Sequence, residues 1–215
     1  EVLLSQETAL VGEYLGSSGC FDCHEVPSPA AQERKKTDFF INLTEAENWV
    51  FKDKHARAFT NVRQFGEEML KVLGIENLAM ADQCTSCHSN SHWLKTNGGV
   101  EDKSIVYKES GVTCETCHGA SSLWDTKHRT ISWRAESAEI KVGLGMSDIR
   151  NPVTRANICF SCHIGDVSKN RIVTHEMDAA GHPPLPSIEL ETFLEKMPRH
   201  WRTVEEKKTE PKEGF

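Results

Sequence analysis

Cysteine is the residue whose spacing carries the most chemistry in this sequence. All eight cysteines fall into pairs, and a histidine directly follows each pair. The four stretches read Cys20-Phe-Asp-Cys23-His24, Cys84-Thr-Ser-Cys87-His88, Cys114-Glu-Thr-Cys117-His118 and Cys159-Phe-Ser-Cys162-His163. C-x-x-C-H is the attachment signature of haem c, in which two thiols bind the porphyrin and the histidine becomes the proximal iron ligand. The sequence therefore predicts four covalently attached haems c.

Other chemistries of paired cysteines explain less of the pattern. Two zinc sites with four thiolates each, redox dithiols or a disulfide framework would also use C-x-x-C pairs. None of them requires a histidine directly after every second cysteine. Because the haems would use every cysteine, no structural disulfide is expected.

Six histidines remain once the four motif histidines are set aside. They are His55, His92, His128, His175, His182 and His200. Each low-spin iron needs a second axial ligand, which can be histidine or methionine. The methionines lie in stretches that favour packing, so four bis-histidine sites of low potential are predicted. The expected distal ligands are His55, His128, His175 and His182.

The other two histidines are weaker candidates for ligands. His92 lies four residues after His88 and cannot easily reach the opposite face of the same haem. His200 remains an alternative near the end of the chain. If one distal histidine were missing, that iron would be open to a small ligand.

The elements that hold these residues are expected to be short helices and loops. Haems take over much of the work of a hydrophobic core, which predicts a mostly α fold with extensive loops around four stacked haems. Thr44-Glu-Ala-Glu47 reads as a capping box. Apolar spacing then predicts a helix over 45–73, either continuous or broken near Thr60-Asn61, with Gly74 as its stop.

The second half of the chain is expected to be less regular. Residues 119–158 read as irregular, with one short helix near 133–141. Pro183-Pro-Leu-Pro186 predicts an extended break. Ser187 could then cap a helix that ends before Pro198.

Length, charge and hydropathy limit the class of protein. The 215 residues favour a single domain over 1–200 with a charged tail over 201–215. The net charge of −7 argues against a protein that binds nucleic acid. No apolar run of 18 residues is present, which argues against a transmembrane helix.

Haem c attachment predicts a periplasmic or otherwise extracytoplasmic location. The first residues lack a basic and an apolar region, so we interpret the sequence as a mature product without its signal peptide.

The order of these pieces resembles the cytochrome c554-like multihaem cytochromes. The resemblance covers about residues 16–200 and is most specific at Gly111-Val-Thr-Cys-Glu-Thr-Cys-His-Gly119, with His128 downstream. It implies a mostly α fold with stacked haem pairs and periplasmic electron transfer. It also implies that His55 pairs with His118 and His128 with His24. His175 and His182 would serve His88 and His163 in an order left open.

The sequence also departs from the namesake type of that family. The namesake leaves its second haem five-coordinate and takes a late histidine for the fourth, a position that His200 would fill here. The presence of both His175 and His182 argues against an open second haem in this chain.

Electron carriage is the function that these features favour. Six-coordinate irons leave no room for substrate, and no nucleophile motif or Gly-rich phosphate loop is present, so the chain is not predicted to be an enzyme. Its acidity favours redox partners that are basic at the contact. Two alternatives stay open. One is a haem enzyme with an open second iron, near His92 and Lys95, acting on a small nitrogen or sulfur compound. The other is a subunit of an extracellular filament, a homo-oligomer or a respiratory complex.

Overall fold

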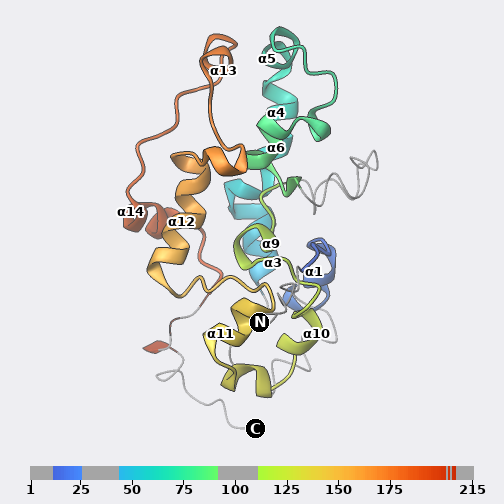
Figure 1. Cartoon of the computed structure of the whole chain (residues 1–215), viewed down its shortest axis with the longest axis vertical. Coiled ribbons are helices and arrows are strands. Elements are labelled where there is room, and N and C mark those ends of the chain that lie inside the picture. The colour runs from blue at the N-terminus through green and yellow to red at the C-terminus, as the bar shows by residue number, and fades with distance from the viewer. Residues whose placement is uncertain (1–11, 26–43, 92–110, 202, 204, 207–215) are drawn as a thin grey trace, which may run out of the picture.

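The chain folds into an elongated array of short helices. A computed structural model describes residues 12–25, 44–91, 111–201, 203 and 205–206. Helices α5 and α13 lie at one end of the long axis, and α10 and α11 lie at the other (Figure 1). Within these residues there is no strand, only an isolated antiparallel bridge between Asp166 and Arg171. The predicted mostly helical fold is confirmed.

The first half of the described chain contains eight helical segments. They are α1 (Ser18–His24), α3 (Glu45–Glu47), the π-helix η1 (Asn48–Lys52), the 3-10 helix η2 (Lys54–Arg57), α4 (Ala58–Phe65), α5 (Glu67–Val72), the 3-10 helix η3 (Leu78–Met80) and α6 (Asp82–His88).

The predicted helix over 45–73 is interrupted in places that the sequence did not indicate. It breaks at Asp53, which is extended (φ −84°, ψ 127°), and again at Gly66, not near Thr60-Asn61. The expected capping box at Thr44 is wrong, because its hydroxyl makes no cap to the backbone and instead accepts from Asn48 Nδ2 at 3.4 Å. The stop at Gly74 is confirmed: Gly74 has φ +65°, and Ile75 N donates to Leu70 O at 2.8 Å.

The second half contains eight more helical segments. They are α9 (Cys114–His118), α10 (Asp125–His128), the 3-10 helix η4 (Ser132–Ala135), α11 (Ala138–Gly143), α12 (Pro152–His163), the 3-10 helix η5 (Val167–Lys169), α13 (His175–Ala179) and α14 (Leu190–Lys196).

Helix α12 corrects the expectation of irregular structure up to residue 158. It runs for 12 residues, and Asn151 caps it by accepting from the amides of Val153 and Thr154 at 2.9 and 3.2 Å. Pro152 occupies the first turn, where no amide is needed. The short helix expected near 133–141 is divided between η4 and α11. Helix α14 ends before Pro198 as predicted, but Glu189 caps it instead of Ser187.

Two small apolar clusters hold the helices of the first half together. One joins α4 to η3 and α6 through Phe59, Val62, Leu78, Ala81 and Cys84. The other joins α1 to α3, η1 and η2 through Phe21, Ala46, Trp49 and Ala56, with Cys20 and Cys114 packed against it. Both clusters contain motif cysteines, so the apolar interior is built around the C-x-x-C-H segments.

Several expectations concern residues outside the described part. Most of the charged tail predicted over 201–215 belongs to this group. His92 and Lys95 also lie outside it. Among the described helices, none combines the length and the apolar character needed to cross a bilayer.

Candidate functional site

Each C-x-x-C-H motif lies at the C-terminal end of a helix. Helices α1, α6, α9 and α12 all end at the motif histidine, namely His24, His88, His118 and His163. In a helix the cysteines are three residues apart and therefore share one face. No two of the eight cysteines are joined by a disulfide.

The third motif is held by the tightest local geometry. A capping box between Thr113 and Thr116 starts α9, and Gly119 ends it with φ +89°. A Cβ at Gly119 would lie 2.1 Å from the Gly145 carbonyl oxygen, so only glycine fits there. Ser147 N donates to His118 O at 2.8 Å, which ties this helix end to the 145–147 turn.

The structure places a second histidine ring opposite each motif histidine. The distances between ring centroids are 6.4 Å for His24 and His128, 6.0 Å for His163 and His55, 6.3 Å for His88 and His182, and 6.5 Å for His118 and His200. These four pairs bring together eight of the ten histidines in the sequence. Each of the four motif helices therefore ends at a histidine whose ring faces a histidine from another segment.

The spacing of the pairs fits two imidazoles on opposite sides of one iron. A bond from a metal to an imidazole nitrogen is about 2 Å, and the centroid lies about 1 Å further, so two trans ligands separate their centroids by about 6 Å. Direct stacking of the rings would bring them much closer. The angle between ring planes ranges from 7° to 88° in the four pairs. Each imidazole can rotate about its bond to the metal, so binding to one metal does not fix the angle between the two ring planes. The donor set therefore suits a haem at each pair.

The protonation of the rings also suits metal binding. Burial lowers the pKa of His118 to about 4, and burial likewise lowers the pKa of His88, His128 and His163. These imidazoles are neutral at pH 7, and each keeps a lone pair for a metal. His55 differs, because a hydrogen bond to Asp53 raises its pKa.

The observed pairs differ in part from those that the resemblance implied. His128 lies against His24 as expected. His55 lies against His163 and not against His118, whose ring faces His200 instead. The physical reason is the path of the last segment: after α14 it returns to η1, where Asn48 Nδ2 donates to the Arg199 carbonyl oxygen at 3.2 Å and fixes the neighbouring His200.

His175 was expected as a ligand but belongs to none of the four ring pairs. It is the first residue of α13 and is exposed, and the Thr174 hydroxyl caps that helix by accepting from Met177 N at 3.3 Å. His182 follows α13 and reaches His88. Its Nδ1 lies 2.7 Å from the Pro183 carbonyl oxygen. The path of the chain through helix α13 thus brings His182, and not His175, opposite His88.

Contacts between motif cysteines place the four motifs in one row. The Cys20 and Cys114 side chains are neighbours, packed against the same apolar cluster, which joins the first motif to the third. The Cys87 and Cys162 side chains are likewise neighbours and join the second motif to the fourth. Cys117 lies close to Cys159, which joins the third motif to the fourth. Burial and, less strongly, the charge of the Cys159 thiolate raise the pKa of Cys117 to about 12. The order in space is therefore first, third, fourth, second.

One arginine connects the motifs at the second and fourth positions. Arg171 donates from Nε to the Ser86 carbonyl oxygen at 2.9 Å and from Nη1 to Ser161 Oγ at 2.5 Å. Ser86 Oγ in turn donates to Asn170 O at 2.8 Å. Ser86 and Ser161 each lie between the cysteines of their motif, so this turn holds the two motifs against one another.

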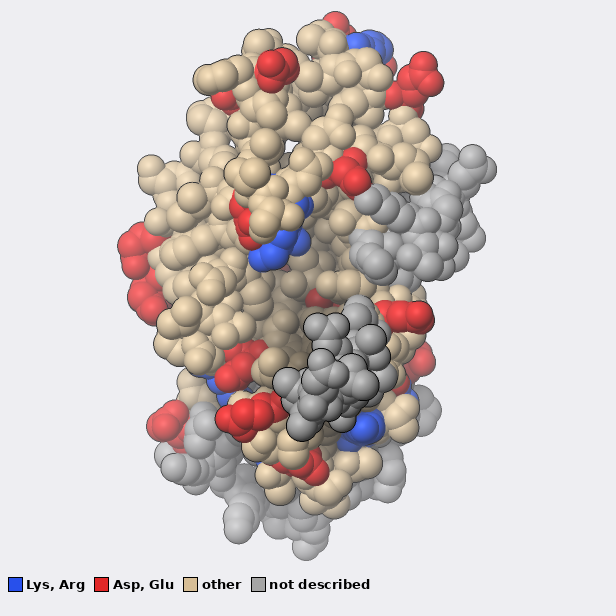
Figure 2. Space-filling model, in the orientation of Figure 1, with Lys and Arg blue, Asp and Glu red and all other residues tan. Residues whose placement is uncertain are grey.

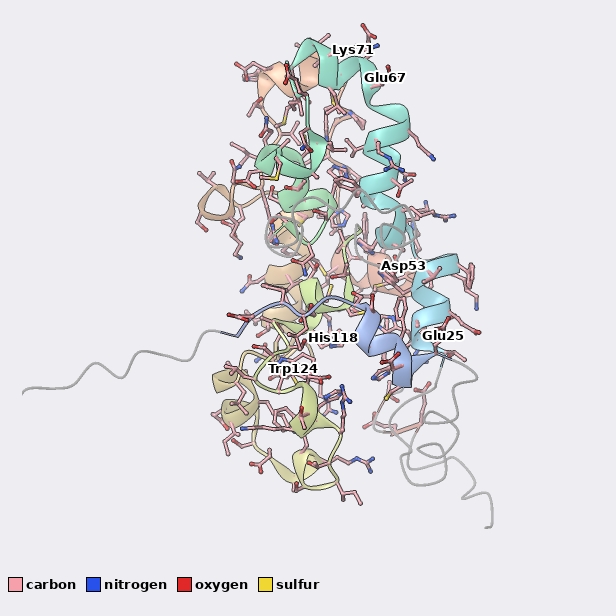
Figure 3. The ribbon with its side chains drawn as sticks, turned by 90° about the vertical axis from the view of Figure 1, so that its right-hand side faces the viewer. Glu25, Asp53, Glu67, Lys71, His118 and Trp124 are labelled. Carbon is pink, nitrogen blue, oxygen red and sulfur yellow. The ribbon has the colours of Figure 1, made fainter. Side chains whose placement is uncertain are left out.

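A buried glutamate does the same for the first and third motifs. Glu115, 1% exposed, accepts from the amides of Leu15, Gly16 and Ser121 at 3.1, 2.8 and 2.9 Å, and from Ser121 Oγ at 2.5 Å. It belongs to the third motif, and Leu15 and Gly16 lead into the first. Figure 3 shows His118, the last residue of the same helix, in the middle of the molecule and above Trp124. Neither Glu115 nor Arg171 was singled out in the sequence, although Glu115 stands within its most specific stretch.

Comparison with known proteins supports the assignment of the first three motifs. Residues 19–119 match the family described as cytochrome c554 and c-prime. The match includes His55 and ends at Gly119, so the fourth motif, His128, His182 and His200 lie beyond it. No curated protein and no solved structure matches the chain.

Proposed function

Because residues 19–119 form a cytochrome c554 and c-prime family domain, we propose that the whole chain is a tetrahaem c-type cytochrome that carries electrons between protein partners. The observation that carries this proposal is the set of four histidine pairs, one for each C-x-x-C-H motif. When bound, haem c supplies a one-electron iron couple.

The residues of the chain have separate tasks in this proposal. The motif cysteines fix each haem covalently, and the motif histidines ligate one side of each iron. His128, His55, His182 and His200 fill the other side of the sites of His24, His163, His88 and His118. Two strong ligands on each iron exclude substrate, which favours a carrier over an enzyme.

The row of motifs gives the carrier two ends. The site of His24 and His128 lies toward α10, and the site of His88 and His182 lies toward α13, with the other two sites between them (Figure 1). Contacts between neighbouring motifs keep adjacent sites close. The chain therefore offers one end site to an electron donor and the other to an acceptor.

The surface suits partners that are basic at the contact. The sequence carries 32 acidic and 25 basic residues, and Figure 2 shows acidic side chains at both ends and along the sides of the face in view. Charge complementarity would speed the encounter and weaken as salt is added. We propose an extracytoplasmic location, because haem c attachment takes place outside the cytoplasm.

Carbon monoxide binding to the reduced protein tests the ligation. We expect the optical spectrum of the dithionite-reduced wild type to be unchanged by carbon monoxide. Replacing any one of His55, His128, His182 and His200 by alanine should open one iron and shift about a quarter of the haem absorbance.

His175→Ala is the matched control, because His175 lies near the site of His182 but in no ring pair. It should behave as the wild type. A carbon monoxide shift in the wild type would contradict four six-coordinate irons and would favour an enzyme with an open site. A shift in His175→Ala would reassign the ligand of that site.

A further inference from the structure

Asp53 is a buried carboxylate in contact with one of the paired histidines. It is 2% exposed, and its Oδ1 lies 2.8 Å from His55 Nδ1. A carboxylate can only accept, so Nδ1 of His55 is the donor. This bond leaves Nε2 of His55 as the nitrogen with the free lone pair and fixes the orientation of the ring. The same oxygen, Oδ1, also accepts from the His55 amide at 3.0 Å, and two donors on one carboxylate oxygen favour its ionised form.

The local backbone does not require a negative charge at this position. Asp53 separates η1 from η2 and caps η2 by accepting from His55 N at 3.0 Å. Asparagine and serine cap helices about as well as aspartate. Within the described residues, the second oxygen, Oδ2, is buried without a hydrogen-bond partner, which is a costly arrangement for a carboxylate. Capping alone therefore does not explain why a carboxylate is buried at this position.

The surroundings of Asp53 include histidines from two different pairs. His55 faces His163 at 6.0 Å between ring centroids. Asn48, whose carbonyl oxygen accepts from Asp53 N at 3.0 Å, donates to the Arg199 carbonyl oxygen at 3.2 Å, which brings the neighbouring His200, the partner of His118, to the same region. Figure 3 shows Asp53 and His118 in the middle of the long axis, between the end at Lys71 and the end beyond Trp124. One carboxylate thus lies beside the distal ligands of the two middle sites in the row.

We infer that Asp53 lowers the reduction potential of the two middle sites, most strongly that of His55 and His163. This inference rests on the proposed function, because it takes His55 and His200 to be iron ligands. Reduction adds one electron to a ferric iron and makes or breaks no covalent bond. A nearby negative charge stabilises the ferric state, and a carboxylate acceptor makes the imidazole a stronger donor to the metal.

At the two end sites of the row, the acceptors next to the histidine Nδ1 atoms are weaker than Asp53. His182 Nδ1 faces a neutral carbonyl oxygen, that of Pro183, at 2.7 Å. His24 Nδ1 lies 3.6 Å from Glu45 Oε2, and the Glu45 side chain is 16% exposed against 3% for Asp53. A longer contact has a smaller electrostatic effect. The strongest effect is therefore expected in the interior of the row.

Redox titration of Asp53→Asn, followed by electron paramagnetic resonance on the haem-loaded protein, tests this inference. Asparagine keeps the size and the capping oxygen but removes the charge. The signal that His55→Ala removes identifies the first middle site, and the signal that His200→Ala removes identifies the second. In Asp53→Asn we expect reduction of the first to become about tenfold more favourable, or about 59 mV for one electron. The second should shift in the same direction by less.

Glu68→Gln is the control for net charge, since the Glu68 side chain is 85% exposed and has no hydrogen bond to a histidine ring within the described residues. It should move all four potentials slightly and equally. If Asp53→Asn loses helical circular dichroism, Asp53→Ser, which retains a capping oxygen, replaces it. Equal shifts at all four sites, or no shift, would overturn the role of Asp53. If His55→Ala and His200→Ala open no iron to carbon monoxide, the proposed ligation fails instead.

Discussion

At the scale of single residues, buried charges determine how the motifs are held together. Glu115 accepts four hydrogen bonds from two segments that lie about a hundred residues apart in the sequence, and it has almost no contact with water. Hydrogen bonds to a charged group contribute more than neutral ones, and losing the acceptor leaves buried amides unsatisfied. Glu115 therefore fixes the position of the first motif relative to the third.

Replacing Glu115 by alanine should destabilise the protein markedly. The amides of Leu15, Gly16 and Ser121 would lose their acceptor, which should reduce the free energy of unfolding by about 3 kcal/mol. Denaturant unfolding of the haem-loaded protein, followed by circular dichroism, measures the change. Glu68→Ala is the control, because the Glu68 side chain is 85% exposed and should change the value by less than about 0.5 kcal/mol. Equal effects of the two variants would contradict a bridging role for Glu115.

The identity of the residues at the candidate site was easier to predict than their pairing. The C-x-x-C-H spacing gave the eight cysteines and four motif histidines directly, and seven of the eight paired histidines were expected. The partners of His118 and His163 depend on where the chain after α14 returns, and no local pattern encodes that path. Asp53, two residues before His55, could have been noticed as a carboxylate within reach of a histidine.

At the scale of elements, close backbone contacts place the distal histidines. The stretch before α9 runs against η2: Val112 N donates to His55 O at 3.0 Å, and Trp49 Nε1 donates to Val112 O at 2.9 Å. A Cβ at Gly111 would lie 2.4 Å from Ala56 O and 2.6 Å from His55 O. The absence of a side chain at Gly111 is therefore what allows η2 to present His55 at this position.

Gly111→Ala should displace η2 and weaken the ligation by His55 before that of the other histidines. Overpacking of this kind costs about 1–3 kcal/mol. The reduced variant should bind carbon monoxide at one site, and the site should match the one opened in His55→Ala. Gly143→Ala, at the end of α11, has no atom within 4 Å of the added carbon and should be neutral or slightly stabilising. A Gly111→Ala protein that excludes carbon monoxide as the wild type does would show that η2 tolerates the shift.

Element boundaries were predicted well where a single residue type determines them. Gly74 and Pro198 end helices as expected. The break at Asp53 was missed, because aspartate is compatible with both helix and cap, and the tertiary contact with Val112 decides between them. Helix α12 was missed although Asn151-Pro152 is a good start signal, because its apolar face has no strong helical period.

At the scale of the whole molecule, the described residues alone provide little core. The two clusters contain five and four buried residues, while Val167, Ile131 and Phe51 are 80%, 76% and 72% exposed. Chains with so little buried apolar surface usually need disulfides, metals or cofactors to fold. This agrees with the inference from composition that haems replace much of a conventional core, whereas the order of the motifs along the axis could not be read from the sequence.

Removing the haems should therefore unfold the molecule as a unit. We expect a chain with all eight cysteines replaced by serine to lose most of its helical circular dichroism and its slow amide hydrogen exchange, because four covalent cross-links and their apolar surfaces disappear together. Replacing only Cys20 and Cys23 should leave the cluster around Phe59 and Cys84 protected from exchange. A cysteine-free chain that unfolds cooperatively with full helix content would show that the protein part folds without its cofactors. The haems would then bind to a fold that forms without them, and the two small apolar clusters would stabilise the fold more than their size indicates.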